Sequence, residues 1–264
     1  MKSSINRIAA AAFALIAITA GSSVQAQATI DQNKALAGSV TPGDLPGFPI
    51  TLSVPGSYKL TGNLVVPASL PGVVVTATGV TLDLNGFSIS GPGTCTRNDI
   101  TAVVTCVGLS GDPDGVYFKS GGNTLRNGIV RGFYDGVRLS GADHIENMLV
   151  EQNAGSGMSV NNNQGGTAMV RTVRSQLNGH DGFSLSYSVV HGSTASSNGR
   201  HGFIVLNTVL LDSVSMSNHN VGFNNFSGGG DAMPIGRSVG IFNKGTNFVV
   251  PRSLGGNLDG STVF

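Results

Sequence analysis

The central part of the chain alternates between glycine-marked bends and short apolar segments. Six segments between Asp114 and Gly222 begin alike, with a bend residue, a glycine and then alternating apolar and polar positions. Apolar residues two positions apart are the pattern of a half-buried β-strand. The pairs that follow this pattern are Val116 and Phe118, Val137 and Leu139, Met158 and Val160, Phe183 and Leu185, and Phe203 and Val205.

The spacing of these segments predicts how they are arranged. Their glycines follow one another at intervals of 20 to 25 residues, at Gly115, Gly136, Gly157, Gly182, Gly202 and Gly222. A fixed period in this range marks a solenoid whose repeats stack on their neighbours. About 20 residues are too few for two helices but enough for a coil of short strands joined by tight turns. The sequence therefore predicts an all-β solenoid in which stacked coils build parallel sheets.

A column of asparagines occupies one bend of the predicted coil. Asn153, Asn178, Asn198 and Asn218 each stand four residues before a repeat glycine. Asparagine tolerates left-handed backbone angles, and its amide can bond the amide of the next coil. We expect these residues to form a structural ladder with no catalytic role.

These repeats resemble the right-handed parallel β-helix proteins with pectin-lyase-like architecture. The stretch from Thr78 to Gly91, TGVTLDLNGFSISG, is similar to the opening coil of many exported members, and the resemblance covers Pro55 to Val250. It implies a single-stranded right-handed parallel β-helix with coils of about 20 residues. It specifies activity weakly, because the family includes polysaccharide lyases, hydrolases, epimerases and adhesins.

The N-terminus predicts export. Lys2 and Arg7 are followed by an 11-residue apolar run, Ile8 to Ile18, and then by small residues, so residues 1–28 read as a signal peptide cleaved after Ala26 or Ala28. A membrane span needs about 20 apolar residues, so membrane anchorage by this run is the weaker alternative, and no other stretch could span a membrane. We therefore expect a secreted or periplasmic protein with no membrane span after cleavage.

The mature chain is predicted to be one domain and a monomer. We expect a lead-in and N-terminal cap at 29–55, the β-helix at 56–250 and a C-terminal cap or tail at 251–264. The coil between Gly157 and Gly182 is longer than its neighbours, and the polar run 161–166 is its expected bulge. An excess of residues at 92–112 is expected to project as an insertion.

The two cysteines, Cys95 and Cys106, both fall in that insertion. In an exported protein a disulfide between them is the expected state. Tying a loop of about a dozen residues contributes on the order of 3 kcal/mol in the chain-entropy model. A metal pair is the alternative, and it lacks histidines or further cysteines at ligand spacing.

Charge and composition exclude some partners. The full chain has a formal charge of +1, and only 11% of its residues are charged, against 39 glycines. Loss of the two signal-peptide cations leaves the mature chain nearly neutral, which argues against binding to nucleic acid. A local basic cleft for an acidic polysaccharide stays compatible with this charge.

Candidate chemistry lies in the bend column. Residues at equivalent positions of stacked coils lie about 4.8 Å apart, so the residues just before each glycine share one edge. We predict one set of catalytic residues and a second set that binds substrate. As an alternative to binding substrate, Asp114 and Asp135 of the second set could hold a calcium ion. The catalytic set is His180, Asp181, Arg200, His201 and Tyr134, and the substrate-binding set is Asp135 and Asp114.

Two functions fit this column. Arg200 could neutralise a uronate carboxylate while a histidine or Tyr134 moves the proton beside it, as lyase or epimerase chemistry requires. Asp112-Pro113-Asp114 is similar to the Asp-Pro-His of alginate epimerases, with aspartate in place of histidine. The other function is a non-catalytic adhesive or structural β-helix, because aspartate before glycine is also ordinary turn chemistry.

Overall fold

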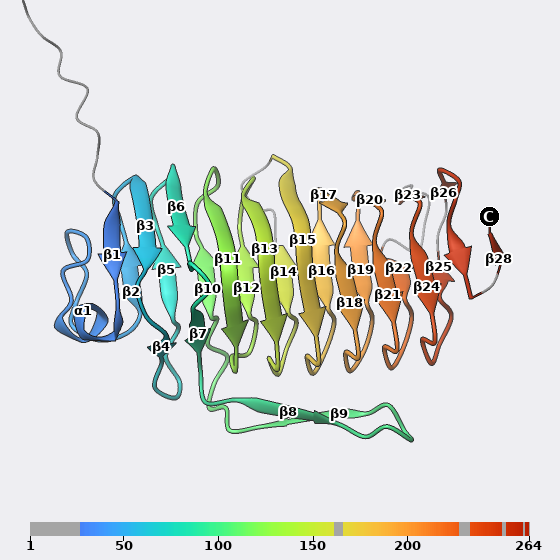
Figure 1. The fold of residues 1–264 in the computed structure, drawn as a ribbon, viewed down its shortest axis with the longest axis horizontal. Coiled ribbons are helices and arrows are strands. Elements are labelled where there is room, and N and C mark those ends of the chain that lie inside the picture. The colour runs from blue at the N-terminus through green and yellow to red at the C-terminus, as the bar shows by residue number, and fades with distance from the viewer. Residues whose placement is uncertain (1–26, 161–165, 227–232, 250–251, 261, 264) are drawn as a thin grey trace, which may run out of the picture.

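The computed structural model describes residues 27–160, 166–226, 233–249, 252–260 and 262–263. The predicted signal segment, the run 161–165 and the glycine-rich run 227–232 lie outside the described residues, apart from Gln27 and Ala28. No helix in the described ranges is long and apolar enough to cross a membrane. The chain is a parallel β-helix, which confirms the fold class predicted from the repeat (Figure 1).

One sheet, here sheet B, takes one strand from each coil. Each strand pairs in parallel with the equivalent strand of the next coil, and the predicted apolar pairs face the core. Val116 pairs with Val137, for example, and Phe118 with Leu139. The described strands of sheet B are β2 (Ile50–Leu52), β5 (Val73–Val75), β10 (Val116–Phe118), β12 (Val137–Leu139), β14 (Met158–Val160), β16 (Phe183–Ser186), β19 (Phe203–Leu206), β22 (Phe223–Asn225) and β25 (Phe248–Val249).

The remaining coil strands form sheet A, which bends around the other side of the core. The bend falls at residues with positive φ, such as Thr172 at 53° and Asp212 at 52°. Its described strands are β1 (Ala28–Ile30), β3 (Gly56–Leu60), β4 (Leu64–Val65), β6 (Val80–Asp83), β7 (Ser88–Ser90), β11 (Thr124–Arg131), β13 (His144–Glu151), β15 (Ala168–Gln176), β17 (Ser188–His191), β18 (Thr194–Ser196), β20 (Val209–Leu211), β21 (Val214–Met216), β23 (Pro234–Gly236), β24 (Val239–Ile241), β26 (Arg252–Ser253), β27 (Leu258–Asp259) and β28 (Thr262–Val263).

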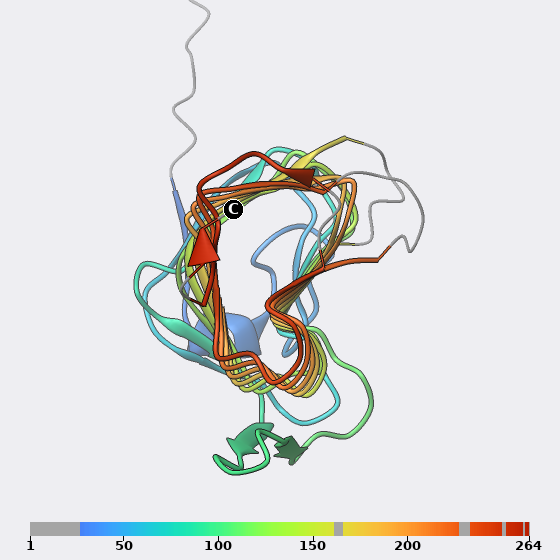
Figure 2. The same ribbon diagram turned by 90° about the vertical axis from the view of Figure 1, so that its right-hand side faces the viewer.

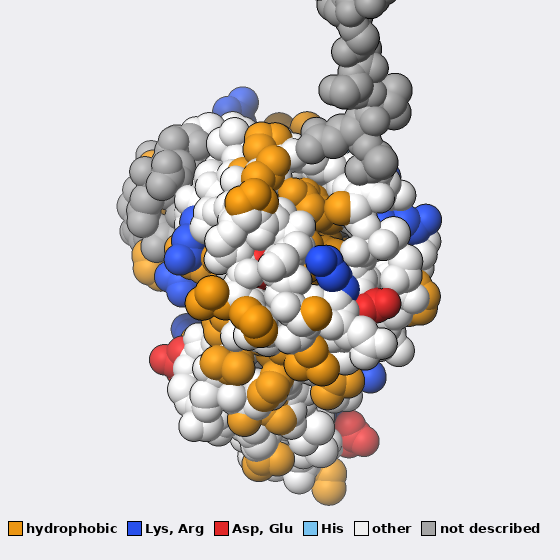
Figure 3. Space-filling model, turned by 90° about the vertical axis from the view of Figure 1, so that its left-hand side faces the viewer, with side chains coloured by type: hydrophobic (Ala, Val, Ile, Leu, Met, Phe, Trp, Pro, Cys, Tyr) orange, Lys and Arg blue, Asp and Glu red, His pale blue; other side chains and the backbone are white. Residues whose placement is uncertain are grey.

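The stretch 29–55 contributes both a cap and strands. Helix α1 (Gln32–Ala37) begins after Asp31, whose side chain accepts the Lys34 N–H at 2.8 Å, and it ends at Gly38, where φ is 73°. This N-cap and left-handed C-terminal glycine are the usual helix boundary signals. β1 and β2 pair with β3 and β5, so the first coil starts within this stretch. At this end, exposed hydrophobic side chains are scattered between separate charged groups of both signs (Figure 3).

The C-terminal stretch extends the solenoid. β26 and β27 pair in parallel with β23 and β24, while β28 turns back antiparallel to β27. This return strand covers part of the last open sheet edge, which is how solenoids limit edge-to-edge association.

The asparagine ladder is buried at one bend. Asn178 and Asn198 are both 0% exposed, and the Asn178 side-chain amide donates to Asn198 Oδ1 at 3.0 Å. The same oxygen accepts the backbone N–H of Asn178 at 3.1 Å. The left-handed conformation lies one residue earlier than the asparagine, at Leu177 and Ser197. The asparagine side chain instead turns inward and satisfies bend amides that water cannot reach.

The insertion 92–112 forms a disulfide-tied hairpin, here called the arm. Its strands are β8 (Thr94–Arg97) and β9 (Val104–Val107), and Cys95 is bonded to Cys106. The arm lies outside the coils and runs beside them along the solenoid axis (Figures 1 and 2). Its contacts reach coils distant in sequence, because Lys244 Nζ donates to the Thr101 carbonyl at 2.9 Å. The predicted disulfide is confirmed, and the insertion lies against the solenoid.

Candidate functional site

The candidate residues lie where each coil turns into its sheet B strand. The turns are stacked by backbone bonds, such as Gly115 N–H to the Asp135 carbonyl at 3.0 Å and Gly182 N–H to the His201 carbonyl at 2.9 Å. From Asp114 to His201 the column crosses four coil spacings, or about 19 Å at 4.8 Å per coil. The two ends of the column therefore cannot act on the same sugar ring.

At the C-terminal end of the column the side chains hold the turns together. Asp181 Oδ1 accepts the His201 backbone N–H at 3.0 Å, and His201 Nδ1 accepts the Val221 backbone N–H at 3.3 Å. Both residues are buried, and burial lowers the pKa of His201 against the opposing effect of Asp181. Asp181 Oδ1 and His201 Nδ1 are thus occupied in bonds between coils, which favours the turn role that aspartate before glycine usually has.

Arg200 lies on the surface beside this end. Its Nη1 is 3.8 Å from Asp181 Oδ2, and 52% of its side chain is exposed. A solvated ion pair at this distance contributes little to stability. The exposed side chain of Arg200 could contact a ligand. Asp181, the aspartate beside it, is already bonded to the His201 backbone and holds the turn.

The N-terminal end of the column holds a different arrangement. Asp114 is buried, and its Oδ2 lies 3.7 Å from Nη1 of Arg138 on β12. Burial raises the pKa of Asp114 to about 7, with a further increase from Asp135 that Arg138 opposes. A carboxyl group that exchanges its proton near neutral pH is suited to general acid or base catalysis.

Asp135 joins this group to the next coils. Its Oδ1 accepts the Ser156 backbone N–H at 2.8 Å, and burial raises the pKa of its carboxyl group. The effect of burial is reduced by that backbone bond, by the charges of Arg138 and His180, and by a hydrogen bond from Ser159. The carboxyl group of Asp135 is thus close enough to both Arg138 and His180 for their charges to affect its pKa.

Tyr134 and His180 approach each other across the turns. Their ring centroids are 6.2 Å apart in an edge-to-face arrangement, and both side chains are partly exposed. Burial raises the pKa of the Tyr134 hydroxyl, and the charges of Asp135 and Asp112 raise it further. The structure therefore brings together Tyr134, Asp135, Asp114 and His180 and leaves Asp181, Arg200 and His201 in the C-terminal part of the column.

Two neighbours of this group were missed by the sequence analysis. Tyr117 and Arg138 are the outward-facing middle residues of β10 and β12, paired in register, and the guanidinium carbon lies 5.2 Å from the Tyr117 ring centroid. A cation at this distance from an aromatic face is attracted by the ring quadrupole. The signal was present, since both residues stand two positions after a repeat glycine, where the alternation points outward.

Calcium fits this site poorly. Calcium takes six to eight oxygen ligands. Across the described parts of the chain, no three His, Cys, Asp or Glu residues gather in a way that could hold a metal ion. One oxygen of Asp135 already accepts a backbone N–H, and Arg138 lies beside Asp114. We therefore derive no step through calcium.

The raised pKa of Asp114 predicts a pH dependence of stability. A carboxyl group with a folded-state pKa of about 7, against a usual 3.8, binds its proton more tightly when folded. Its contribution to stability is full below about pH 4 and is lost as the pH rises through 7, a difference on the order of 4 kcal/mol. Asp114→Asn should remove this loss, so urea unfolding should show the variant gaining on the wild type from pH 4 to pH 8. An unchanged difference across that range would contradict the assignment.

Comparisons with known proteins reach only the level of fold. No protein-family model and no curated protein matches the chain by sequence. Among solved structures, it is similar to the Dettilon tailspike protein, with 16% identity and a TM-score of 0.47, over 71% of this chain and 38% of that one. It is also similar to the A-module of the mannuronan C-5 epimerase of Azotobacter vinelandii, with 16% identity and a TM-score of 0.45, over 73% of this chain and 64% of that one. The chain spans less than two thirds of either protein, and likenesses at this level do not extend to substrate or reaction.

Proposed function

We propose that this protein binds an acidic polysaccharide across the outer face of sheet B and exchanges the proton next to a sugar carboxylate. The single observation that supports this most is Asp114, a buried carboxyl group with a pKa of about 7, beside the half-exposed Arg138. The site combines a proton carrier near its working pH with a cation able to hold a carboxylate.

Arg138 would bind the uronate carboxylate. Its guanidinium group has fixed donors that match a carboxylate, and 42% of the side chain is open to solvent. The ring of Tyr117 restricts the motion of the Arg138 side chain on one side, so that side chain loses less conformational entropy when it binds a ligand. Lys119 also lies over this ring, 5.7 Å from its centroid, and adds positive charge to the same face.

Proton transfer would follow from the groups on either side of the bound sugar. In its ionised form Asp114 accepts the proton from the carbon that bears the carboxylate, and the electron pair moves into the carboxylate to form an enediolate. Arg138 stabilises the negative charge that develops on those oxygens. Return of a proton to the opposite face, from Tyr134 or His180, gives epimerisation. If one of these groups instead protonates the neighbouring glycosidic oxygen, the bond from carbon to that oxygen breaks and a carbon–carbon double bond forms, which is elimination.

The same proposal places the protein outside the cytoplasm, in the periplasm or beyond the cell. Its support is the Cys95–Cys106 disulfide, since such bonds persist mainly in oxidising compartments. The predicted signal peptide would direct this export.

Arg138→Gln is expected to weaken binding of a uronate hexasaccharide by about ten- to a hundred-fold, because it removes one charge-assisted bidentate contact. Isothermal titration against mannuronate, guluronate and galacturonate oligomers measures this and identifies the preferred sugar. The matched control is Arg174→Gln on β15, which removes an exposed arginine of sheet A that bonds Gln176. Equal affinity of wild type and Arg138→Gln would reject the site, and the absence of binding to any uronate would favour the non-catalytic structural alternative.

A further inference from the structure

A small depression lies on sheet A, away from the residues described above. Its volume is about 180 Å³, and it spans three neighbouring strands, β15, β17 and β20. This is well below the roughly 300 to 1,000 Å³ of sites for drug-sized ligands, so it suits a group the size of one ring. The lining residues are Met169, Arg171, Val189, His191 and Leu211.

The register of the strands gives the depression an apolar floor and a charged margin. Met169 pairs with Val189, and 42% of the methionine side chain is exposed. Arg171 pairs with His191, which in turn pairs with Leu211, so these three side chains follow one another at single-coil spacing. Three apolar side chains, those of Met169, Val189 and Leu211, thus adjoin Arg171 and His191 on this sheet face.

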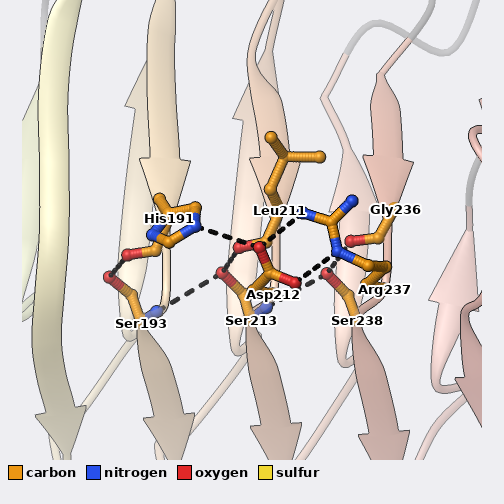
Figure 4. Close-up of polar contacts among 8 residues, drawn as sticks. All are labelled: His191, Ser193, Leu211, Asp212, Ser213, Gly236, Arg237 and Ser238. Atoms are coloured by element: carbon orange, nitrogen blue, oxygen red, sulfur yellow. Dashed lines mark hydrogen bonds and ion pairs between the residues drawn. The ribbon is translucent and has the colours of Figure 1, made fainter.

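His191 is held in place by residues of the next two coils. Its Nε2 lies 3.0 Å from Asp212 Oδ2, and Arg237 donates to both oxygens of Asp212 at 2.6 and 2.7 Å (Figure 4). The carboxylate of Asp212 is therefore occupied on both oxygens, and Arg237 is the main cause of its lowered pKa. The network fixes the imidazole, so it would be ordered before a ligand arrives.

Arg171 carries a charge that the described residues leave without an ion pair. Its register neighbour on β13 is Glu146, whose carboxylate lies 3.6 Å from His144 Nε2. Asp212, the other acid nearby, is held by Arg237. The margin of the depression therefore offers one available cation and an ordered imidazole above an apolar floor.

We propose that this depression is a second saccharide subsite, which binds a single carboxylated pyranose ring of the acidic polymer. The apolar face of the ring packs on Met169 and Val189, while its carboxylate pairs with Arg171 beside the imidazole of His191. The ligand class rests on the proposed function, but no residue is shared with the Asp114 site. A polymer strand held here would tether substrate to the protein without entering the reaction.

Methionine methyl signals provide a direct test, because Met169 lies on the depression. Protein labelled with carbon-13 at the methionine methyls is titrated with trimannuronate and with neutral cellotriose, each to millimolar concentration. Met169→Leu assigns the signal. The expected result is a saturable shift of the Met169 methyl with trimannuronate, little shift with cellotriose, and a roughly ten-fold weaker response in Arg171→Gln.

Two controls separate this proposal from the first one. Arg174→Gln removes an exposed arginine from the same strand and should leave the Met169 titration within about two-fold of wild type. Arg138→Gln should leave it unchanged as well, even where it abolishes binding at sheet B, so each site can fail alone. An absent Met169 shift, an equal shift with cellotriose, or equal losses in Arg171→Gln and Arg174→Gln would overturn the second subsite.

Discussion

Replacing Asp114 by asparagine is expected to lower the turnover of a uronate polymer about a thousand-fold and to change its affinity only a few-fold. The amide keeps the size and much of the polarity of the carboxyl group but cannot carry the proton. General acid–base catalysis typically contributes 10²- to 10⁴-fold, which sets the scale of the loss. The variant is also expected to fold, because the buried carboxyl group costs stability at neutral pH.

Two assays on the same samples measure this effect. Proton spectra in heavy water follow the loss of the signal from the hydrogen beside the carboxylate, which reports exchange and epimerisation. Ultraviolet absorbance of the unsaturated product reports elimination. The pH dependence of the wild-type rate should show an ionisation near 7, the pKa that burial gives Asp114, and this step should be absent from the residual activity of the variant.

Asp143→Asn is the matched control. Asp143 is also buried, and burial raises its pKa to about 6, but it lies in the turn that follows β12, at the opposite end of the strand from Asp135. Turnover within a few-fold of wild type in Asp143→Asn shows that a titrating buried aspartate is not sufficient by itself. Full turnover in Asp114→Asn would remove Asp114 from the mechanism, and loss of both binding and turnover would give it a role in holding substrate.

Phe203→Ala is expected to lower the free energy of unfolding by about 4 kcal/mol. Phe203 is 0% exposed and lies in a stack of phenylalanines from successive coils. Its ring centroid is 4.6 Å from that of Phe183 and 5.0 Å from that of Phe223, with the planes within a few degrees of parallel. Truncation removes the buried ring and leaves a cavity that neighbours fixed by the coil spacing cannot close.

Urea unfolding followed by circular dichroism measures this loss. Phe226→Ala is the control, since 71% of that side chain is exposed, and its change should stay within about 0.5 kcal/mol. Each coil contacts mainly its neighbours, so hydrogen exchange should accelerate first around β16, β19 and β22. A loss below about 1 kcal/mol would show that the coils adjust to the cavity and that the stack is not a rigid core.

Most of the coil geometry could be predicted from local patterns. The alternation at Phe183 and Leu185 identified the inward face of β16, and the spacing of the glycines identified the stack. The bond between the side chains of Asn178 and Asn198 could be predicted because equal residues at equal positions must meet when coils repeat. The left-handed conformation at Leu177 could not, since that residue has no intrinsic preference for it and the ladder imposes it.

The site was predicted less completely than the coil. The bend column contained Tyr134, Asp135, Asp114 and His180, and the structure brings these together. Arg138 was overlooked because it lies on the strand and not in the bend. The column also contained Asp181 and His201, whose side chains bond the backbone of the next coil. From residue types alone, such structural residues cannot be told apart from catalytic ones.

The position of the arm depended on tertiary contacts alone. The length of the arm and its disulfide follow from the sequence. Its position beside the coils depends on its close approach to two glycines of the coils, Gly179 and Gly199. A Cβ added to Gly179 would lie 3.0 Å from Cys106 Sγ, and one added to Gly199 would lie 3.3 Å from Val104 Cβ. These contacts join residues that no local pattern connects.

The sequence by itself determined the solenoid, because a repeated phrase with alternating apolar positions has one efficient way to bury its side chains. It also determined which residues share an edge. Only the tertiary structure decided which of them have altered chemistry. The pKa of Asp114 depends on how far it is removed from water and on its proximity to Asp135 and Arg138. Desolvation and charge proximity both depend on distances in three dimensions. The sequence period fixes the distance between coils along the solenoid axis, but it does not fix how side chains lie perpendicular to that axis.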